Sequence, residues 1–333
     1  MLKKILKIKL LFITLIIVLF ISATNFCLFY LFAPGPLTEN KIIIIEPKLS
    51  IEQISTKLSY DKIVKYPKLF ELLAKIYSFQ KTLKSGEYIF TSHISPVQVL
   101  RILANGKSII HKMIVPEGSI VNEIISKIND EQRLLGEIKG IIPEGFLMPS
   151  TYFYSYGDQK EQLIDQMRKL MSANLDLVMK KLSSNSPIKT RLQLLTLASI
   201  VEKEAQLDEE RPIIAAVFLN RLKKNMKLQA DPTTIYAITQ GKYKLERKLT
   251  KNDLLIQSPY NTYYSSSLPP MPIACPGLKS LEAVVNPANS GALYFVVNGK
   301  GGHNFSVNYV DHVNHIKSYK DSVKASKPII LSE

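Results

Sequence analysis

An uninterrupted apolar stretch near the amino terminus limits what this chain can fold into more than any other feature. Residues 10–33 read LLFITLIIVLFISATNFCLFYLFA and contain no charged side chain. About 20 apolar residues suffice for a helix to cross a bilayer, so residues 10–33 are predicted to form a transmembrane helix. Residues 1–9 carry four lysines, and positive charge beside a span tends to stay in the cytoplasm. We therefore expect a single-pass protein of the inner (cytoplasmic) membrane, with residues 1–9 as a basic cytoplasmic tail and the body of the chain outside.

A cleaved signal peptide is the alternative interpretation of this stretch. Apolar cores of signal peptides are typically about 7–15 residues long, shorter than residues 10–33, and residues 21–24 (ISAT) make a poor cleavage site. A retained anchor is therefore favoured. Function then lies outside the cytoplasm, where ATP and nicotinamide cofactors are scarce. The chain contains neither a P-loop nor a GxGxxG motif, and no cofactor is expected.

The chain is strongly basic, with 43 Lys and Arg against 28 Asp and Glu and a net charge of +15. A basic body favours polyanionic neighbours such as nucleic acid, anionic lipid or an anionic wall polymer; a lysine-rich compositional bias is the alternative explanation. Nucleic acid is not an expected partner, because the body faces outward and lacks a recognition motif. The five histidines and two cysteines have no metal-site spacing, so no metal is expected. Cys27 lies in the predicted span, so we expect no disulfide with Cys275.

Beyond the anchor, the pattern changes character near residue 140. Residues 40–130 alternate short strand-like runs with short amphipathic helices, which predicts a small α+β module. Ser50 and Ser119 are the expected N-caps of two of its helices. Residues 140–326 are mainly helical with short strands, and helices are expected at 160–183, 187–206, 210–224, 232–239 and 309–326. The predicted fold class is α+β, with a transmembrane helix, the small module and then the mainly helical domain.

Two glutamates at the end of a predicted helix are the candidate acids. Residues 196–204 read TLASIVEKE, and Glu202 and Glu204 are two positions apart, or about 200° around a helix. Only one of them can face a given cleft. A glutamate that continues an apolar stripe loses solvation, which raises its pKa and suits it to donate a proton near neutral pH. The alternative is that both are solvated or paired with Arg211 or Lys203, and helix phase alone does not decide between them.

The surrounding motifs resemble a known family. The chain reads LASIVEKE at 197–204, ER at 210–211, VFLNRL at 217–222 and MKLQADPT at 226–233. In the same order lie PEGFLMPSTY at 143–152, SPYNTY at 258–263, LPPMPI at 268–273, PG at 276–277, YFV at 294–296 and HNF at 303–305. Together these motifs resemble the YceG-like, MltG-type endolytic murein transglycosylases over residues 40–318.

The chain departs from the family pattern at Ser150, Asn225, Ala230, Ser267, Met271 and Cys275. Asn225 stands where the family usually has glycine, and asparagine tolerates a left-handed backbone. Met271 and Cys275 alter the shape of the proline-rich loop.

The resemblance implies a lyase that cuts the β-1,4 MurNAc–GlcNAc bond within peptidoglycan strands, leaves 1,6-anhydro-MurNAc ends and so terminates strand elongation. It implies Glu202 as the catalytic acid, a LysM-like module at 40–130 and a catalytic transglycosylase domain at 140–326, with penicillin-binding synthases as partners. Ordinary glycosidases use two carboxylates. One suffices here, because the same group first protonates the leaving oxygen and then accepts the proton of the muramic acid's own C6 hydroxyl. The rival function is a noncatalytic, membrane-anchored peptidoglycan-binding scaffold.

Five further residues are candidate substrate-binding groups, because they offer hydrogen bonds or sugar-stacking rings: Gln229, Asp231, Tyr260, Asn261 and Tyr263. Loop packing is an equal alternative for four of them. Asp231 and Pro232 have the form of a helix start, with Asp as the cap and Pro at the first helical position.

Three other motif residues have structural interpretations. Glu144 is expected in a turn. Arg211 is expected to pair with Glu204 or steady a helix junction, and His303 is either a buried, hydrogen-bonded residue or a substrate ligand.

Overall fold

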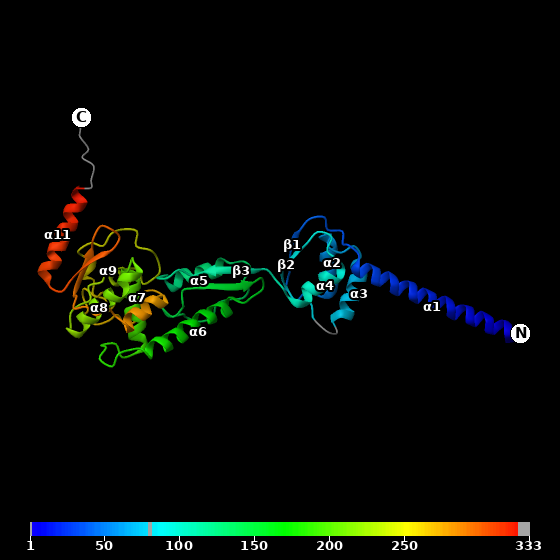
Figure 1. The fold of residues 1–333 in the computed structure, drawn as a ribbon, viewed down its shortest axis with the longest axis horizontal. Helices are drawn as coiled ribbons and strands as arrows, with labels where there is room; N and C mark the ends of the chain where they lie inside the picture. The colour runs from blue at the N-terminus through cyan, green and yellow to red at the C-terminus, as the bar shows by residue number, and fades with distance from the viewer. Residues whose placement is uncertain (1, 79–81, 326–333) are drawn as a thin grey trace, which may run out of the picture. The chain divides into compact units, whose positions relative to one another are not determined.

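The computed structural model describes residues 2–78 and 82–325, and it forms two compact units (Figure 1). The anchor unit comprises Met1–His111, Arg133–Leu135 and Phe153–Asp158; the carboxyl-terminal unit comprises Lys112–Gln132, Gly136–Tyr152 and Gln159–Glu333. The fold mixes helices and short strands, as the α+β prediction requires. By compactness the chain divides after His111, so residues 112–130 belong with the second unit. The domain boundaries at 130 and 140 stay predictions.

The anchor unit begins with α1 (Leu2–Phe32), whose segment Lys4–Phe32 is long and apolar enough to cross a membrane. Next, β1 (Lys41–Ile45) pairs antiparallel with β2 (Gly86–Phe90), from Lys41 opposite Phe90 to Ile45 opposite Gly86. Helices α2 (Ile51–Tyr60), α3 (Pro67–Ser78) and α4 (Pro96–Asn105) gather beside this pair (Figure 1). The unit's core includes Leu58, Phe70, Tyr88, Phe90 and Leu103, all fully buried.

The two predicted serine caps have different outcomes. Ser50 caps α2 as expected: its hydroxyl accepts from the backbone N–H of Gln53, and the Gln53 side chain accepts from the Ser50 N–H. The prediction for Ser119 is wrong. Helix α5 (Val121–Asp130) has Ile120 at its N-cap, and the Ser119 hydroxyl instead donates to the carbonyl oxygen of Pro116 at 2.8 Å.

The five helices predicted beyond residue 140 are present, within four residues of their expected bounds: α6 (Lys160–Met179), α7 (Arg191–Glu204), α8 (Arg211–Lys223), α9 (Asp231–Thr239) and α11 (Tyr309–Ala325). The other elements are β3 (Ile110–Ile114), β4 (Thr151–Ser155), η1 (Asp208–Glu210), η2 (Asp253–Leu255), α10 (Leu278–Val285), β5 (Tyr294–Val297) and β6 (His303–Ser306). Of these, β4, α10 and β6 were not predicted from the sequence. Strand β3 pairs with β4, and β5 pairs antiparallel with β6. Asn225 has a φ of 52°, the left-handed conformation expected where the family has glycine.

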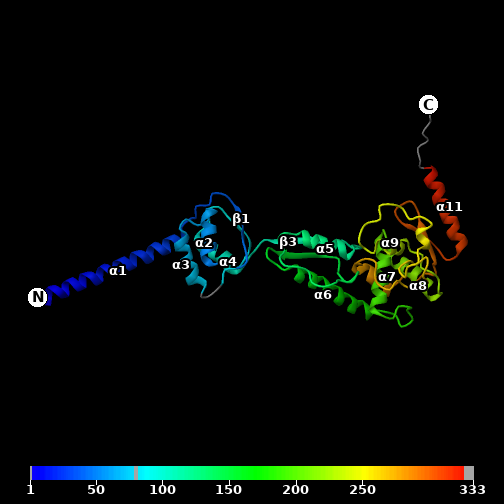
Figure 2. The ribbon, with the colours of Figure 1, turned by 180° about the vertical axis from the view of Figure 1, so that it is seen from behind.

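Helix α7 is the centre of the carboxyl-terminal unit, where it gathers with α8 and α9 (Figure 2). Its residues from Leu194 to Glu202 are all buried, and they pack with α6, α8 and α10. A helix buried on every side must satisfy most of its polar groups within the protein. The Ser199 hydroxyl does so by donating to the Thr196 carbonyl and accepting from the Ile273 N–H. The Thr196 hydroxyl is the exception, because it is buried without a hydrogen-bond partner among the described residues.

We expect Ser50→Ala to destabilise α2 by about 1 kcal/mol, because it removes the acceptor for an otherwise unpaired helix N–H. Native-state hydrogen exchange of the α2 amides should become roughly fivefold faster. Thr56→Ala, an exposed site in the same helix, is the control and should leave exchange unchanged or slower, since alanine favours helix. Equal exchange in Ser50→Ala and wild type would contradict the cap.

Candidate active site at the end of helix α7

Glu202 is held by partners on both of its oxygens. Its side chain is 4% exposed. Oε1 accepts from Nη1 of Arg211 at 2.9 Å, and Oε2 accepts from the backbone N–H of Gly277 at 2.9 Å. Pairing with Arg211 is thus the outcome for Glu202, whereas the predicted pair between Arg211 and Glu204 is wrong. Each oxygen of this carboxyl therefore has one hydrogen-bond donor within the protein, and one lone pair on each oxygen stays available.

Arg211 is the centre of a wider polar network. Its Nη1 also donates to the Ser280 hydroxyl at 2.6 Å, and its Nε donates to Asp208 at 3.0 Å. Glu117 lies 3.7 Å from the Arg211 Nη2, and its pKa is raised by burial and by the negative charge of Glu202. Gly277 lies close to this network: a Cβ there would lie 1.9 Å from Oε1 of Glu117, so a larger residue would displace the Glu117 side chain. The network joins α7, α8 and the start of α10.

Glu204 has a different environment. Its side chain is partly buried and makes no hydrogen bond or ion pair within the described ranges 2–78 and 82–325. Burial, and next the negative charge of Asp231, raise the pKa of Glu204 to about 8. Such a carboxyl stays protonated near neutral pH and can donate its proton. The two glutamates therefore differ as their spacing requires, and the unpaired acid is Glu204.

Asp231 and Tyr263 lie beside Glu204. The Tyr263 hydroxyl donates to Oδ1 of Asp231 at 2.6 Å, and burial followed by that hydrogen bond raises the pKa of Tyr263. The charges of Asp231 and Glu204 also contribute to the raised pKa of Tyr263, since both carboxyls lie near its ring hydroxyl. The predicted cap at Asp231 is wrong by one position. Asp231 is the first residue of α9, and the N–H of Thr233 donates to the carbonyl oxygen of Ala230.

The other predicted substrate-binding residues separate into different roles. Gln229 is exposed, with a φ of 52°, and its Oε1 accepts from Nη1 of Arg221 at 3.3 Å. Tyr260 is partly buried and packs against Tyr236, with the ring centroids 4.9 Å apart. The charge of Glu144 contributes to the raised pKa of both tyrosines, after burial. Gln229 is thus exposed to solvent and precedes Asp231 by two residues in the sequence. Tyr260, by contrast, packs near Glu144.

Asn261 has a structural role. It is fully buried, and its Oδ1 accepts from the Thr234 hydroxyl at 2.8 Å. Its Nδ2 donates to the carbonyl oxygens of Leu254 and Ile256 at 3.0 and 2.9 Å. Every hydrogen-bonding group of the amide is engaged within the protein, so its contacts do not fit the predicted saccharide binding. They fit the loop-packing alternative.

Glu144 and His303 lie in the structural positions that the sequence allowed. Oε1 of Glu144 accepts from the backbone N–H of Val121 at 2.9 Å, and burial raises the pKa of Glu144. His303 is buried: its Nδ1 lies 2.6 Å from Oε2 of Glu210, and its backbone N–H donates to Oε1 of Glu210 at 2.7 Å. Sequence reasoning missed the partners Gly277, Ser280 and Glu210. The Pro-Gly and Glu-Arg pairs within the family motifs were the available signal.

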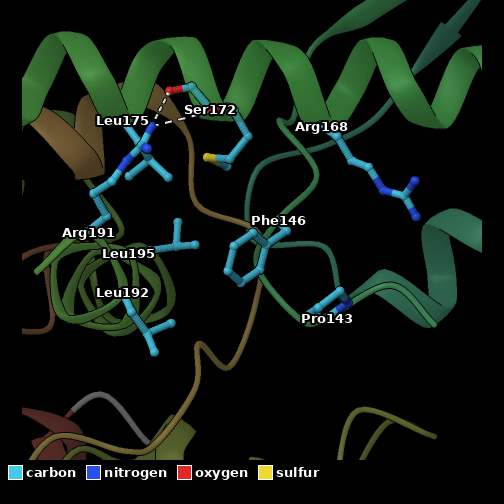
Figure 3. Close-up of a pocket in the computed structure, with 9 residues that line it drawn as sticks. Pro143, Phe146, Arg168, Ser172, Leu175, Arg191, Leu192 and Leu195 are labelled. Carbon is cyan, nitrogen blue, oxygen red and sulfur yellow. Dashed lines mark hydrogen bonds between the residues drawn. The ribbon is translucent and has the colours of Figure 1, made fainter.

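Two cavities lie beside α7. An apolar pocket of about 420 Å³ lies between α6 and α7, with Phe146, Leu192 and Leu195 on its walls (Figure 3). A second cavity of about 290 Å³ has aromatic and charged walls that include Lys203, Tyr236 and Glu123. Neither Glu202, Glu204 nor Asp231 is among the residues that line either cavity. Within residues 2–78 and 82–325, no group of three or more His, Cys, Asp or Glu could hold a metal ion.

Comparisons with known proteins agree on one family. The profile of the YceG-like family matches residues 43–318. The chain is 29% identical over 319 residues to a protein of Streptococcus pneumoniae R6 named endolytic murein transglycosylase, covering 82% of this chain and 57% of that relative. It is 30% identical over 305 residues to a Bacillus subtilis 168 protein of the same name, covering 82% and 83%. The chain thus spans little more than half of the pneumococcal relative.

A solved structure of a putative yceG-like protein from Listeria monocytogenes has a TM-score of 0.52 with this chain and 30% sequence identity. The match covers 83% of this chain and 99% of the Listeria chain.

We expect Asp231→Asn to lower the pKa of Glu204, because it removes the negative charge that disfavours ionisation of the neighbouring carboxyl. The measurement is a pH titration of the Glu204 side-chain carbon in ¹³C-glutamate-labelled protein, assigned with Glu204→Gln. Glu246→Gln removes an exposed charge from the same unit and should leave that pKa unchanged. An identical titration in wild type and Asp231→Asn would show that Asp231 does not act on Glu204.

Proposed function

The chain belongs to the YceG-like family, and from that premise we propose that it is an endolytic murein transglycosylase. In this proposal it cleaves the β-1,4 MurNAc–GlcNAc bond within peptidoglycan strands and leaves 1,6-anhydro-MurNAc ends. Relatives of that name align with 82% of the chain. The single observation that carries the proposal is Glu204, an unpaired carboxyl with a pKa of about 8 at the end of a buried helix. A noncatalytic scaffold has no need of such a group.

Glu204 is the better candidate for the catalytic acid, although the motif resemblance implies Glu202. Both oxygens of Glu202 accept hydrogen bonds from Arg211 and Gly277. Its geometry supports a positioning role, in which it fixes the end of α7 against α8 and α10. Glu204 lacks such partners. Because its pKa is raised, its carboxyl is protonated near neutral pH and can donate the proton that the leaving sugar hydroxyl requires.

The reaction needs one carboxyl in two successive states. Protonated Glu204 transfers its proton to the glycosidic oxygen as the bond between that oxygen and the anomeric carbon breaks. The resulting carboxylate then accepts the proton of the C6 hydroxyl while O6 bonds to the anomeric carbon, which closes the anhydro ring. No water is consumed, and Glu204 ends protonated again. Unlike hydrolysis by paired carboxylates, this sequence needs no second group to activate water.

Asp231 and Tyr263 have supporting roles in this proposal. The carboxylate of Asp231 stabilises positive charge that develops at the anomeric carbon, and its charge keeps Glu204 protonated. Its hydrogen bond from Tyr263 fixes its orientation. Gln229 is the exposed amide beside this group in the chain and is a candidate contact for the sugar hydroxyls. Tyr260 is a candidate stacking surface, and Asn261 is left out because its amide is fully engaged.

The proposed setting is the outer side of the cytoplasmic membrane. Helix α1 can cross a bilayer, and the lysines before it favour a cytoplasmic amino terminus. Residues 40–130 are proposed as a LysM-like module and residues 140–326 as the catalytic domain. Peptidoglycan strands are the proposed substrate, and penicillin-binding synthases are the proposed partners because they make those strands.

We expect Glu204→Gln to lower the yield of 1,6-anhydro-MurNAc products from purified sacculi at least 100-fold, the loss that removal of a general acid typically causes. Its thermal unfolding should stay cooperative. Glu202→Gln should instead lower stability by about 3–5 kcal/mol, since it breaks a buried ion pair. Products are identified by mass, and stability is followed by circular dichroism.

Full activity in Glu204→Gln, together with an inactive but fully stable Glu202→Gln, would show that Glu202 is the catalytic acid. Products with reducing ends would indicate hydrolysis and would reject the lytic mechanism. Binding of sacculi without any product from wild type would favour the scaffold.

The pH dependence of the reaction should report the same acid. A carboxyl with a raised pKa is protonated below that pKa, so kcat/KM should hold its plateau below about pH 8 and fall tenfold per pH unit well above it. Asp231→Asn should move this alkaline limb to lower pH. An activity that stays constant to pH 10 would contradict Glu204 as the proton donor.

A further inference from the structure

The last turns of α1 are built into the core of the anchor unit. Tyr30 is 6% exposed, its ring centroid lies 5.6 Å from that of Tyr66, and its hydroxyl donates to the Tyr66 carbonyl at 3.3 Å. The N–H of Gly35 donates to the carbonyl oxygen of Ile94 at 3.1 Å, and a Cβ on Gly35 would lie 2.3 Å from that oxygen. The segment after the apolar helix is therefore packed, and α1 continues directly into a folded surface.

The level of the membrane surface follows from the length of α1. Its uncharged part starts at Leu10, directly after Lys9. A hydrocarbon core about 30 Å thick takes about 20 residues at about 1.5 Å each, which reaches from Leu10 to about Phe29. The turn that carries Tyr30 then lies at the level of the lipid headgroups, together with the parts of the anchor unit that contact it.

A cavity of about 190 Å³ lies at this level. It is lined by Phe26, Phe29, Tyr30, Ala33, Pro34, Gly35, Pro36, Lys65, Tyr66 and Pro96. Phe26 is 55% exposed, Phe29 73% and Tyr66 43%, and exposed aromatic rings are typical of protein surfaces at the membrane interface. An apolar wall on the α1 side thus continues the surface that the span presents to lipid.

Lys65 is the one charged residue among those that line the cavity. Its Nζ lies 5.3 Å from the centroid of the Tyr66 ring, a cation–π contact that holds the ammonium at the cavity wall. Across residues 2–78 and 82–325 it has no carboxylate partner. Nearby Lys68, by contrast, is paired with Glu52 and Glu71. The cavity therefore combines an uncompensated positive charge with an aromatic, lipid-facing wall.

We propose that this cavity binds the phosphate of an anionic outer-leaflet phospholipid, with the phosphate at Lys65 and the first part of an acyl chain along Phe26 and Phe29. Phosphatidylglycerol fits best, because its headgroup has no cation to compete with the lysine. Bound lipid would fix the anchor unit against the bilayer at a defined rotation around α1. The proposal depends on α1 crossing a membrane and is independent of which glutamate is catalytic.

The test is native mass spectrometry of the full-length protein in detergent micelles, titrated with phosphatidylglycerol, phosphatidylcholine or diacylglycerol. Wild type should bind one phosphatidylglycerol more tightly than phosphatidylcholine, and diacylglycerol should bind at least about fivefold more weakly than phosphatidylglycerol because it lacks the phosphate. Lys65→Met keeps the stem and removes the charge, and it should weaken phosphatidylglycerol binding about fivefold, the effect of about 1 kcal/mol per lysine at a lipid surface. Lys65→Arg should retain binding.

Lys107→Met is the matched control, since Lys107 is an exposed lysine of the same unit outside the cavity lining. Equal lipid affinity in wild type, Lys65→Met and Lys107→Met would overturn the proposal, as would equal binding of diacylglycerol. Displacement of the lipid by millimolar inorganic phosphate would also overturn it, because the site would then select a free anion. Unchanged secondary structure in Lys65→Met shows that a loss of binding is not a loss of fold.

Discussion

The network around the ion pair between Glu202 and Arg211 joins the end of α7 and the start of α8 to the start of α10, about 70 residues further along the chain, and the candidate site depends on it. Glu202 closes the buried part of α7, Arg211 opens α8, and the Gly277 amide and Ser280 hydroxyl belong to the start of α10. A buried ion pair contributes little net stability, but removal of one partner is strongly destabilising. Its effect here is geometric: it fixes where α7 ends, and therefore where Glu204 lies.

Glu202 and Glu204 show how surroundings divide two identical side chains between two roles. Glu202 has a guanidinium and an amide as hydrogen-bond donors. Glu204 has no such donor in the part of the chain that the structure describes. Glu204 also lies near the carboxylate of Asp231, so its ionised form is disfavoured. Two residues along a helix are enough to separate these environments, because that spacing turns the side chain to the other side of the axis. Because α7 is buried from Leu194 to Glu202, the two glutamates keep these different surroundings in the folded protein.

In the anchor unit, the end of the apolar helix α1 is also part of the folded core. Tyr30 belongs to the helix that can cross a membrane, yet it packs in the core beside Tyr66. The Pro34–Pro36 segment makes backbone contacts with residues 93 and 94. A proline and glycine pair indicates only that the helix stops. Whether the chain after it is loose or packed depends on groups about 60 residues away.

By itself the sequence determined the apolar helix, the approximate bounds of most of the other helices, the α+β class and the family. These features depend on local periodicity, charge and motif order, which are present in any stretch of the chain. Ser50 could be predicted as a cap because its partner Gln53 is three residues away. The tertiary structure alone decided that Arg211 pairs with Glu202, that Asn261 is fully engaged in its loop, and that Glu204 is the carboxyl with the raised pKa. Each of these depends on burial and on charges brought close by folding, and neither quantity exists in the unfolded chain.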